Sequence, residues 1–526
     1  MNFFKKYVVL FCLIGTVVLF SCKTTDAASV KEPETAVTEP QVEEPKKVEP
    51  EKSVEKPQAK TSSSKAVPKV PPKRPKPIQP KPVKPKSPQP KAQPKVSELD
   101  FTAKLKTLLE KNKTDEALKL FDSYDQSITQ KVDMQNLKLA ILISNNDIDE
   151  AKTLADSLEK KYPTNTETLL SQSYIAAIDN NQAKRNAYLK KIVALEPKNA
   201  EALTQLGHDA YYAKSYVTAA QYYSKAISAN SGNEDAIVGL ADVLYMQGEF
   251  DKAETQLNSL LKQNPKNASA YAMLARVQFE QSKVLPALEN IGKAIKLEND
   301  VPEFWSDKGL YCSRAGKLKE SLGAYTNVIR LEPENYIAYI YRAGLNDALN
   351  HKDAAINDYQ KVLALYPTYY FAAEGLGVLY FEKNEYQKAG EAFYHAWKYA
   401  PNNTFYALMV TLCYYQLGDV KSGKDFMSKQ LPKIDKKTEE TEYFLSRLFV
   451  DHIGDNDVVA RLDKEKNITK KYRMQFYLAK FYELVKKSEV SDKLYEKASE
   501  CPYPAFFEYR LIEAELAKRG RVSKVK

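Results

Sequence analysis

The chain is poor in the residues that interrupt helices or build metal centres. Its 526 residues include only 17 glycines, five cysteines and four histidines. Scarce glycine together with abundant Ala, Leu, Lys and Tyr favours one extended helical body over several compact domains. The histidines at 208, 351, 395 and 452 are far apart, and no pair has metal-ligand spacing. The sequence also has no nucleophile elbow, so we expect no metal, no cofactor and no catalytic site.

The few cysteines argue against a disulfide framework. After residue 98 only Cys312, Cys413 and Cys501 occur, an odd number at distant positions. A disulfide-stapled domain has an even number of cysteines at close, regular spacing. We expect these three to be small buried residues.

Acidic residues are missing from one segment, and this absence explains the net charge of +10. Residues 57–97 contain ten lysines, one arginine and no acid, or +11, whereas residues 27–56 carry −3 and the first 26 residues +2. The chain from Glu98 onward therefore has no net charge. A neutral body argues against nucleic-acid binding, which depends on a basic face.

The N-terminus has the pattern of a secretory signal. Lys5 and Lys6 precede an apolar run from Tyr7 to Phe20, which is shorter than the roughly 20 residues of a membrane-spanning helix. The run ends in Leu19-Phe20-Ser21-Cys22, which resembles the lipobox of bacterial lipoproteins. This resemblance implies that residues 1–21 are a removed signal peptide and that Cys22 is acylated, for instance with palmitate. An aspartate after the cysteine resembles an inner-membrane retention signal, and its absence here favours the outer membrane, facing the periplasm.

Residues 22–97 are predicted to be a disordered tether. Sixteen of the chain's 27 prolines lie in residues 27–97, where almost no large apolar residue could support a core. The repeated Pro-Lys pattern favours an extended polyproline II spacer. Its lysines could bind anionic lipid or the cell wall, or they could simply keep the spacer soluble; the sequence leaves both interpretations open.

From Glu98 the sequence repeats every 34 residues. Six prolines are separated by 34 or 68 residues: Pro163, Pro197, Pro265, Pro333, Pro367 and Pro401. With proline at frame position 32, small residues occupy position 20 in nearly every frame, and Arg185 is the one large exception. Small residues at fixed positions predict places where two helices approach closely.

These columns resemble the tetratricopeptide repeat (TPR). The clearest copy, residues 200–233, has its signature residues at Leu203, Leu206, Gly207, Tyr216, Ala219, Tyr223 and Ala226. The resemblance implies an all-α solenoid, a right-handed superhelix of helix-turn-helix units with a concave binding surface. We assign about ten repeats to residues 98–437, and degenerate repeats with a capping helix to residues 438–526.

In this family the first helix of each repeat lines the concave groove, at positions that include 2, 5, 9 and 12. The corresponding residues form a predicted aromatic strip with polar neighbours: His208, Tyr211, Tyr212, Asp242, Tyr245, Arg276, Phe279, Arg314, Phe381 and Tyr415. Aromatic residues and arginine dominate protein-binding hot spots, but the same aromatics could pack between helices.

The sequence therefore predicts a lipid-anchored scaffold of the bacterial envelope whose groove binds a protein or peptide. The alternative is a structural tether that links the membrane to the cell wall through its basic segment.

Overall fold

The computed structural model describes residues 98–521, and every element in that range is a helix. The predicted signal peptide, Cys22 and the predicted tether lie outside the described residues. The chain divides at Glu196 into two compact units, which we describe separately. The predicted all-α, TPR-type fold is confirmed.

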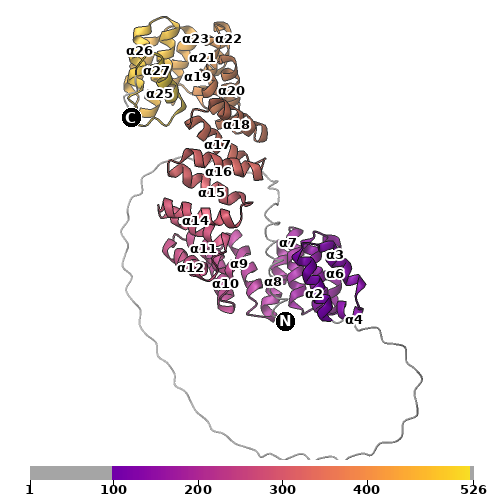
Figure 1. The fold of residues 1–526 in the computed structure, drawn as a ribbon. Helices are drawn as coiled ribbons and strands as arrows, with labels where there is room; N and C mark the ends of the chain where they lie inside the picture. Colours follow the sequence, from indigo (N-terminus) through magenta and orange to yellow (C-terminus); the bar gives the residue numbers. More distant parts are fainter. Residues whose placement is uncertain (1–97, 522–526) are drawn as a thin grey trace, which may run out of the picture. The chain divides into compact units, whose positions relative to one another are not determined.

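The described part of the first unit consists of three helix pairs and one short additional helix, α4 (Figure 1). Its elements are α2 (Glu98–Glu110), α3 (Thr114–Ser123), α4 (Gln126–Thr129), α5 (Val132–Ser144), α6 (Ile148–Lys161), α7 (Thr166–Ile178) and α8 (Gln182–Leu195).

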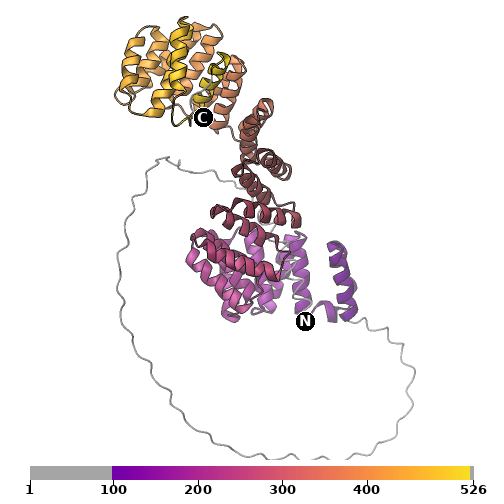
Figure 2. The same ribbon diagram turned by 60° about the vertical axis from the view of Figure 1, so that its left-hand side comes forward.

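The second unit continues the same pattern of paired helices (Figures 1 and 2). Seven pairs are α9 (Ala200–Tyr212) with α10 (Tyr216–Ala229), α11 (Glu234–Met246) with α12 (Phe250–Gln263), α13 (Ala268–Glu280) with α14 (Val284–Leu297), α15 (Pro302–Arg314) with α16 (Leu318–Leu331), α17 (Tyr336–Ala348) with α18 (Lys352–Leu365), α19 (Tyr370–Glu382) with α20 (Tyr386–Tyr399), and α21 (Thr404–Gln416) with α22 (Val420–Gln430). The 3₁₀-helix η1 (Leu431–Lys433) precedes α23 (Glu440–Asp451), α24 (Asp455–Lys464), α25 (Ile468–Leu484), α26 (Ser488–Ala498) and α27 (Phe507–Lys518).

The turn that follows each first helix contains a residue in the left-handed conformation, and these residues recur every 34 positions. They are Asn112, Asn146, Asn180, Lys214, Gly248, Ser282, Gly316, Asn350, Asn384, Gly418, His452, Lys486 and Gly520. Asparagine and glycine adopt this conformation at low cost, which explains their frequency here. The period therefore continues through the weakly matching residues 438–505, and α27 is the first helix of a further frame.

Asparagine also begins many of the first helices. Its side chain at frame position 34 accepts a hydrogen bond from a backbone N–H of the next helix; Asn199 accepts from Ala202 at 3.0 Å and Asn267 from Ala270 at 2.7 Å. Such caps satisfy donors that the helix itself leaves open. The junction between repeats is thus defined by local hydrogen bonding.

The small-residue columns accommodate aromatic rings. A Cβ built on Gly207 would lie 2.6 Å from the ring of Tyr223, and one on Gly239 would lie 2.5 Å from it. Tyr223 therefore packs against the bare backbones of α9 and α11. Tyr325 and Phe393 make the same kind of contact with Gly309 and Gly377. This confirms that small residues mark close helix approach.

The end of the second unit is closed by its own last helices. Helix α25 packs against α21 and α23, α27 packs against α19, and α26 packs against α25 and α27 (Figure 1). One continuous core cluster extends from α18 to α27, whereas the earlier repeats have separate smaller clusters. The last helix, α27, is the one that the sequence predicted to cap the array. It packs against α19 and buries Leu511 and Ile512.

Candidate partner-binding face

In the second unit the first helices of successive repeats contact each other, α9 with α11, α11 with α13, and α13 with α15. We call the solvent-accessible side chains of these four helices the first-helix face. It carries seven of the ten residues that the sequence predicted for the groove, from His208 to Phe279, and Arg314 lies exposed at its far end.

Aromatic rings gather where the face begins. Tyr211 lies edge-on to Tyr212, with ring centroids 5.8 Å apart, and to Tyr216 at 5.6 Å. Tyr212 is 63% exposed and Tyr211 is half-buried. Burial, followed by the nearby Asp242, raises the pKa of Tyr211 to about 12. The phenols are therefore neutral hydrogen-bonding groups at physiological pH.

His208 belongs to the helix packing more than to the exposed strip. One of its ring nitrogens lies 2.8 Å from the Tyr223 hydroxyl, and the two rings are edge-on at 5.4 Å. This contact ties the second helix of the repeat to the first.

Carboxylates lie next to these rings without a matching number of cations. Helices α9 and α11 carry five acidic residues and neither lysine nor arginine. Burial raises the pKa of the half-buried Asp242 to about 6, although Arg276 acts in the opposite direction. Asp235 keeps exposed surface, yet loss of solvent around its carboxyl and repulsion from Glu201 and Glu234 raise its pKa to about 6. Among the described residues, neither Asp235 nor Asp242 has a hydrogen bond or an ion pair.

Polar contacts connect the later helices of the face. The Tyr245 hydroxyl donates to Glu280 at 3.1 Å, which joins α11 to α13. Arg276 Nε donates to Asp307 at 2.7 Å and joins α13 to α15. The one arginine within reach of Asp242 thus already has a carboxylate partner.

Phe279 shows that the two interpretations of the aromatic strip are both partly right. Its ring is half-buried and stacks on Tyr311, with centroids 4.4 Å apart and planes inclined by 25°. Tyr311 itself is buried. Phe279 therefore packs between α13 and α15 and leaves only part of its ring on the surface.

Two predicted groove residues are in the core instead. Phe381 is 3% exposed and Tyr415 is 5% exposed, and both belong to the large C-terminal cluster. The Tyr415 hydroxyl donates to the carbonyl of Phe449 on α23, and Lys480 on α25 lies over the Phe381 ring. Their assignment to an open groove was wrong, because α23 of the following repeat covers Tyr415 and the more distant α25 covers Phe381.

Helix α27 occupies the surface of these later repeats, α17 to α21. Its Arg510 pairs with Glu382 on α19 at 2.5 Å and with Asp347 on α17. Its Phe507 ring lies 5.6 Å from Phe393 and 6.0 Å from Tyr406. Helix α27 is thus bound through carboxylates of two first helices, α17 and α19, and through rings on α20 and α21.

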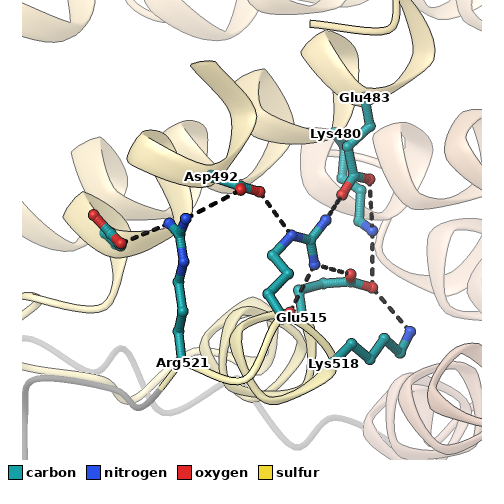
Figure 3. Close-up of polar contacts among 8 residues, drawn as sticks. Lys480, Glu483, Asp492, Glu515, Lys518 and Arg521 are labelled. Atoms are coloured by element: carbon teal, nitrogen blue, oxygen red, sulfur yellow. Dashed lines mark hydrogen bonds and ion pairs between the residues drawn. The ribbon is translucent and has the colours of Figure 1, made fainter. Parts of the chain in front are cut away.

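An ion network holds α27 in this position (Figure 3). Arg519 bonds Asp492 at 2.9 Å and Glu515 at 2.6 Å, and it also reaches Glu483. Lys480 bridges Glu483 and Glu515 at 3.1 and 3.0 Å. Although burial acts to raise it, the pKa of Glu515 is lowered to about 2 by Lys480, Arg519 and Lys518. The network thus joins α25, α26 and α27 through ionised groups.

The sequence prediction included Asp242 but missed two other acids of the face, Asp235 and Asp307. Asp235 stands at position 2 and Asp307 at position 6 of their frames, outside the aromatic column at position 12. The signal was present, because α9 and α11 lack any basic residue. It was hidden by the neutral charge of the whole body.

Other predicted features can be checked within residues 98–521. Cys312, Cys413 and Cys501 are buried free thiols, as predicted. In the same range no group of acidic, histidine or cysteine side chains is arranged to hold a metal ion. None of these helices is long and apolar enough to cross a membrane.

Comparison with known families agrees with the helix pattern. Two tetratricopeptide repeat models match, one over residues 210–277 and the other over residues 306–370 and 346–403. Hsp70-Hsp90 organizing protein 1 of Glycine max is 28% identical over 125 residues, 24% of this chain and 22% of that protein. Hsp70-Hsp90 organizing protein of Triticum aestivum is 27% identical over 128 residues, with the same shares. The chain spans about a fifth of the length of these relatives.

Solved structures with similar helices include MamA, with 22% identity, 31% of this chain and 95% of that chain covered, and a TM-score of 0.30. A tetratricopeptide repeat protein from Parabacteroides merdae has 21% identity, covers 47% of this chain and 98% of its own, and gives a TM-score of 0.33. PilF of Pseudomonas aeruginosa has 17% identity, covers 38% and 92%, and gives a TM-score of 0.35.

The described helices and their fixed 34-residue period define a helical-hairpin repeat protein. Tetratricopeptide repeat models match residues 210–277 and 306–403, so these segments of the chain are tetratricopeptide repeats. Arrays of this kind present extended surfaces that bind other proteins, so the repeats form a protein-interaction scaffold.

Proposed function

We propose that this protein is a lipid-anchored scaffold of the bacterial cell envelope that recruits a protein partner to its first-helix face. The observation that supports this most directly is the contrast between the two ends of the second unit. Around α17–α21 the equivalent surface is filled by α27, whereas on α9–α15 Tyr212 remains 63% exposed. Exposed aromatic rings beside polar groups are typical of protein-binding hot spots.

The anchoring part of the proposal depends on the sequence alone. The segment Leu19-Phe20-Ser21-Cys22 after a short apolar run supports acylation of Cys22. Two or more acyl chains give durable attachment, since each buried methylene contributes about 0.8 kcal/mol. The Pro-Lys-rich residues before Glu98 would then separate the repeats from the membrane surface.

The test is comparative capture from envelope extract with the full chain. The groove variant carries Tyr211→Ala, Tyr212→Ala and Tyr245→Ala. The matched control carries Tyr366→Ala, Tyr394→Ala and Tyr399→Ala, three tyrosines at least 36% exposed on second helices or their ends. We expect partners whose recovery falls about tenfold with the groove variant and stays unchanged with the control. Equal recovery by wild type and groove variant contradicts the proposal.

A further inference from the structure

The first-helix face has a charge that its own side chains do not balance. Its four helices contain eight acidic and three basic residues, and no base lies on α9 or α11. Of the three basic residues, Arg276 already forms an ion pair with Asp307, at 2.7 Å. A half-buried carboxylate without a cation beside it is unfavourable, and a bound cation relieves the cost.

In the later repeats of the same unit, acidic side chains of the first helices are paired with a cation. On α17 and α19 the carboxylates of Asp347 and Glu382 bind the guanidinium of Arg510, and the Phe507 ring of α27 lies against rings of α20 and α21. On α11, Asp235 and Asp242 have no cation bound in this way. Tyrosine rings lie next to Asp242, as Phe393 and Tyr406 lie beside α27.

The chain itself contains a segment of complementary chemistry. Residues 57–97 carry +11 with no acidic residue, and prolines alternate with lysines over much of that length. Aromatic surfaces bind proline-rich segments through ring contacts, and carboxylates bind lysine ammonium groups. Charge and ring chemistry thus favour the same occupant.

Resting on the proposed function, we propose that the first-helix face around Tyr211, Asp235 and Asp242 binds the lysine- and proline-rich segment 57–97 of this chain. The segment is supplied by a second copy of this chain. A basic partner protein then has to displace the bound segment from the face. Occupancy by the segment therefore sets the partner concentration that recruitment requires.

The test measures binding of a labelled peptide, residues 57–97, by fluorescence anisotropy at about 50 mM salt, where screening is weak. The receptor is the full chain in detergent, with the ten lysines and Arg74 of its own residues 57–97 changed to glutamine. No unlabelled copy of the segment then competes with the labelled peptide. We expect saturable binding, and a dissociation constant about tenfold higher after Asp235→Asn with Asp242→Asn. A peptide with glutamine at every lysine should not bind.

The matched control changes two carboxylates elsewhere, Glu298→Gln with Asp300→Asn, in the exposed link between α14 and α15. We expect the control to bind as the parent does. The unfolding temperature of the Asp235/Asp242 variant should not fall, which excludes misfolding. Absence of binding, or equal loss in both double variants, overturns the inference. If the peptide fails to bind while envelope partners are still lost with the tyrosine variant, the proposed function survives and only this inference falls.

Discussion

Single residues decide how closely the helices of one repeat can approach. Tyr223 fills the space that the missing side chains of Gly207 and Gly239 leave open, so three helices share one ring. Protein interiors are close-packed, and an added methyl group in such a contact forces a backbone shift. The glycines in these columns are therefore packing residues.

We expect Gly207→Ala to lower the free energy of unfolding by about 1–3 kcal/mol, because its Cβ would lie 2.6 Å from the Tyr223 ring. Gly344→Ala on α17 is the matched control, since nothing lies within 4 Å of its added Cβ. There alanine should raise stability by about 0.5–1 kcal/mol through its helix propensity. Urea unfolding of both variants measures the difference, and equal effects would contradict the packing role.

The charged carboxylate of Asp242 lowers the stability of the fold, although the proposed binding of a basic segment requires it. Its folded-state pKa of about 6 exceeds the ordinary value of 3.8, so the folded protein holds the proton more tightly than the unfolded chain. This contribution to stability is present below about pH 4 and is lost as the pH rises through 6. The groups that face it are Arg276 on α13 and the tyrosines 211, 212 and 223.

We expect Asp242→Asn to stabilise the fold by about 1 kcal/mol at pH 7.5, a value discounted for the partial exposure of the side chain. The gain should disappear near pH 4, where the wild-type carboxyl is protonated. Unfolding curves at both pH values provide the measurement. A gain that persists unchanged at low pH would show that charge is not the cause.

At the scale of elements, α27 determines which part of the array is closed. Its Arg510 reaches 128 and 163 residues back along the chain to Glu382 and Asp347. Although burial acts in the opposite direction, Arg510 and Lys352 lower the pKa of Glu382, which is almost fully buried. A contact of such large sequence separation converts a linear array into a closed end.

Replacing Arg510 by methionine should destabilise the closed end by about 2 kcal/mol, because Asp347 loses its cation and Glu382 keeps only Lys352. This value is below the usual cost of a broken buried pair because the arginine is partly exposed. The matched control is Arg447→Met on α23, whose exposed pair with Asp451 should contribute little to stability. Hydrogen exchange should accelerate in α17–α21 and α25–α27 but not in α9–α14, since repeat arrays are stabilised by neighbours. Uniform acceleration would show that the two ends unfold together.

At the scale of the whole molecule, the proposed role requires a lipid at the start of the mature chain and a binding face far along the sequence. The chain keeps opposite charges in separate regions, with +11 in residues 57–97 and an excess of acidic residues on α9 and α11. The net charge of the chain from Glu98 onward is zero, and this conceals the separation.

Changing Cys22 to serine should abolish labelling by a palmitate analogue and move the protein from the membrane fraction to the soluble fraction. Cys12→Ser is the matched control, because Cys12 lies inside the apolar run and is removed with the signal peptide in this proposal. It should leave labelling unchanged. Labelling that survives in the Cys22 variant, or is lost in both, argues against the assigned anchor.

The sequence by itself determined the repeat. A hairpin of fixed length must return its small and large residues to the same places, so the 34-residue columns predicted the helix pairs and the close contacts at Gly207 and Ala219. These are local relations within one frame or between neighbouring frames.

Only the tertiary structure decided which aromatics are exposed. Tyr211 and Phe381 stand at the same frame position, yet Tyr211 is half-buried whereas Phe381 is buried, with Lys480 of the distant α25 over its ring. Position within a repeat carries no information about such a distant contact. Likewise, the unbalanced charge around Asp242 depends on which helices neighbour α11 and on Arg276 being held by Asp307.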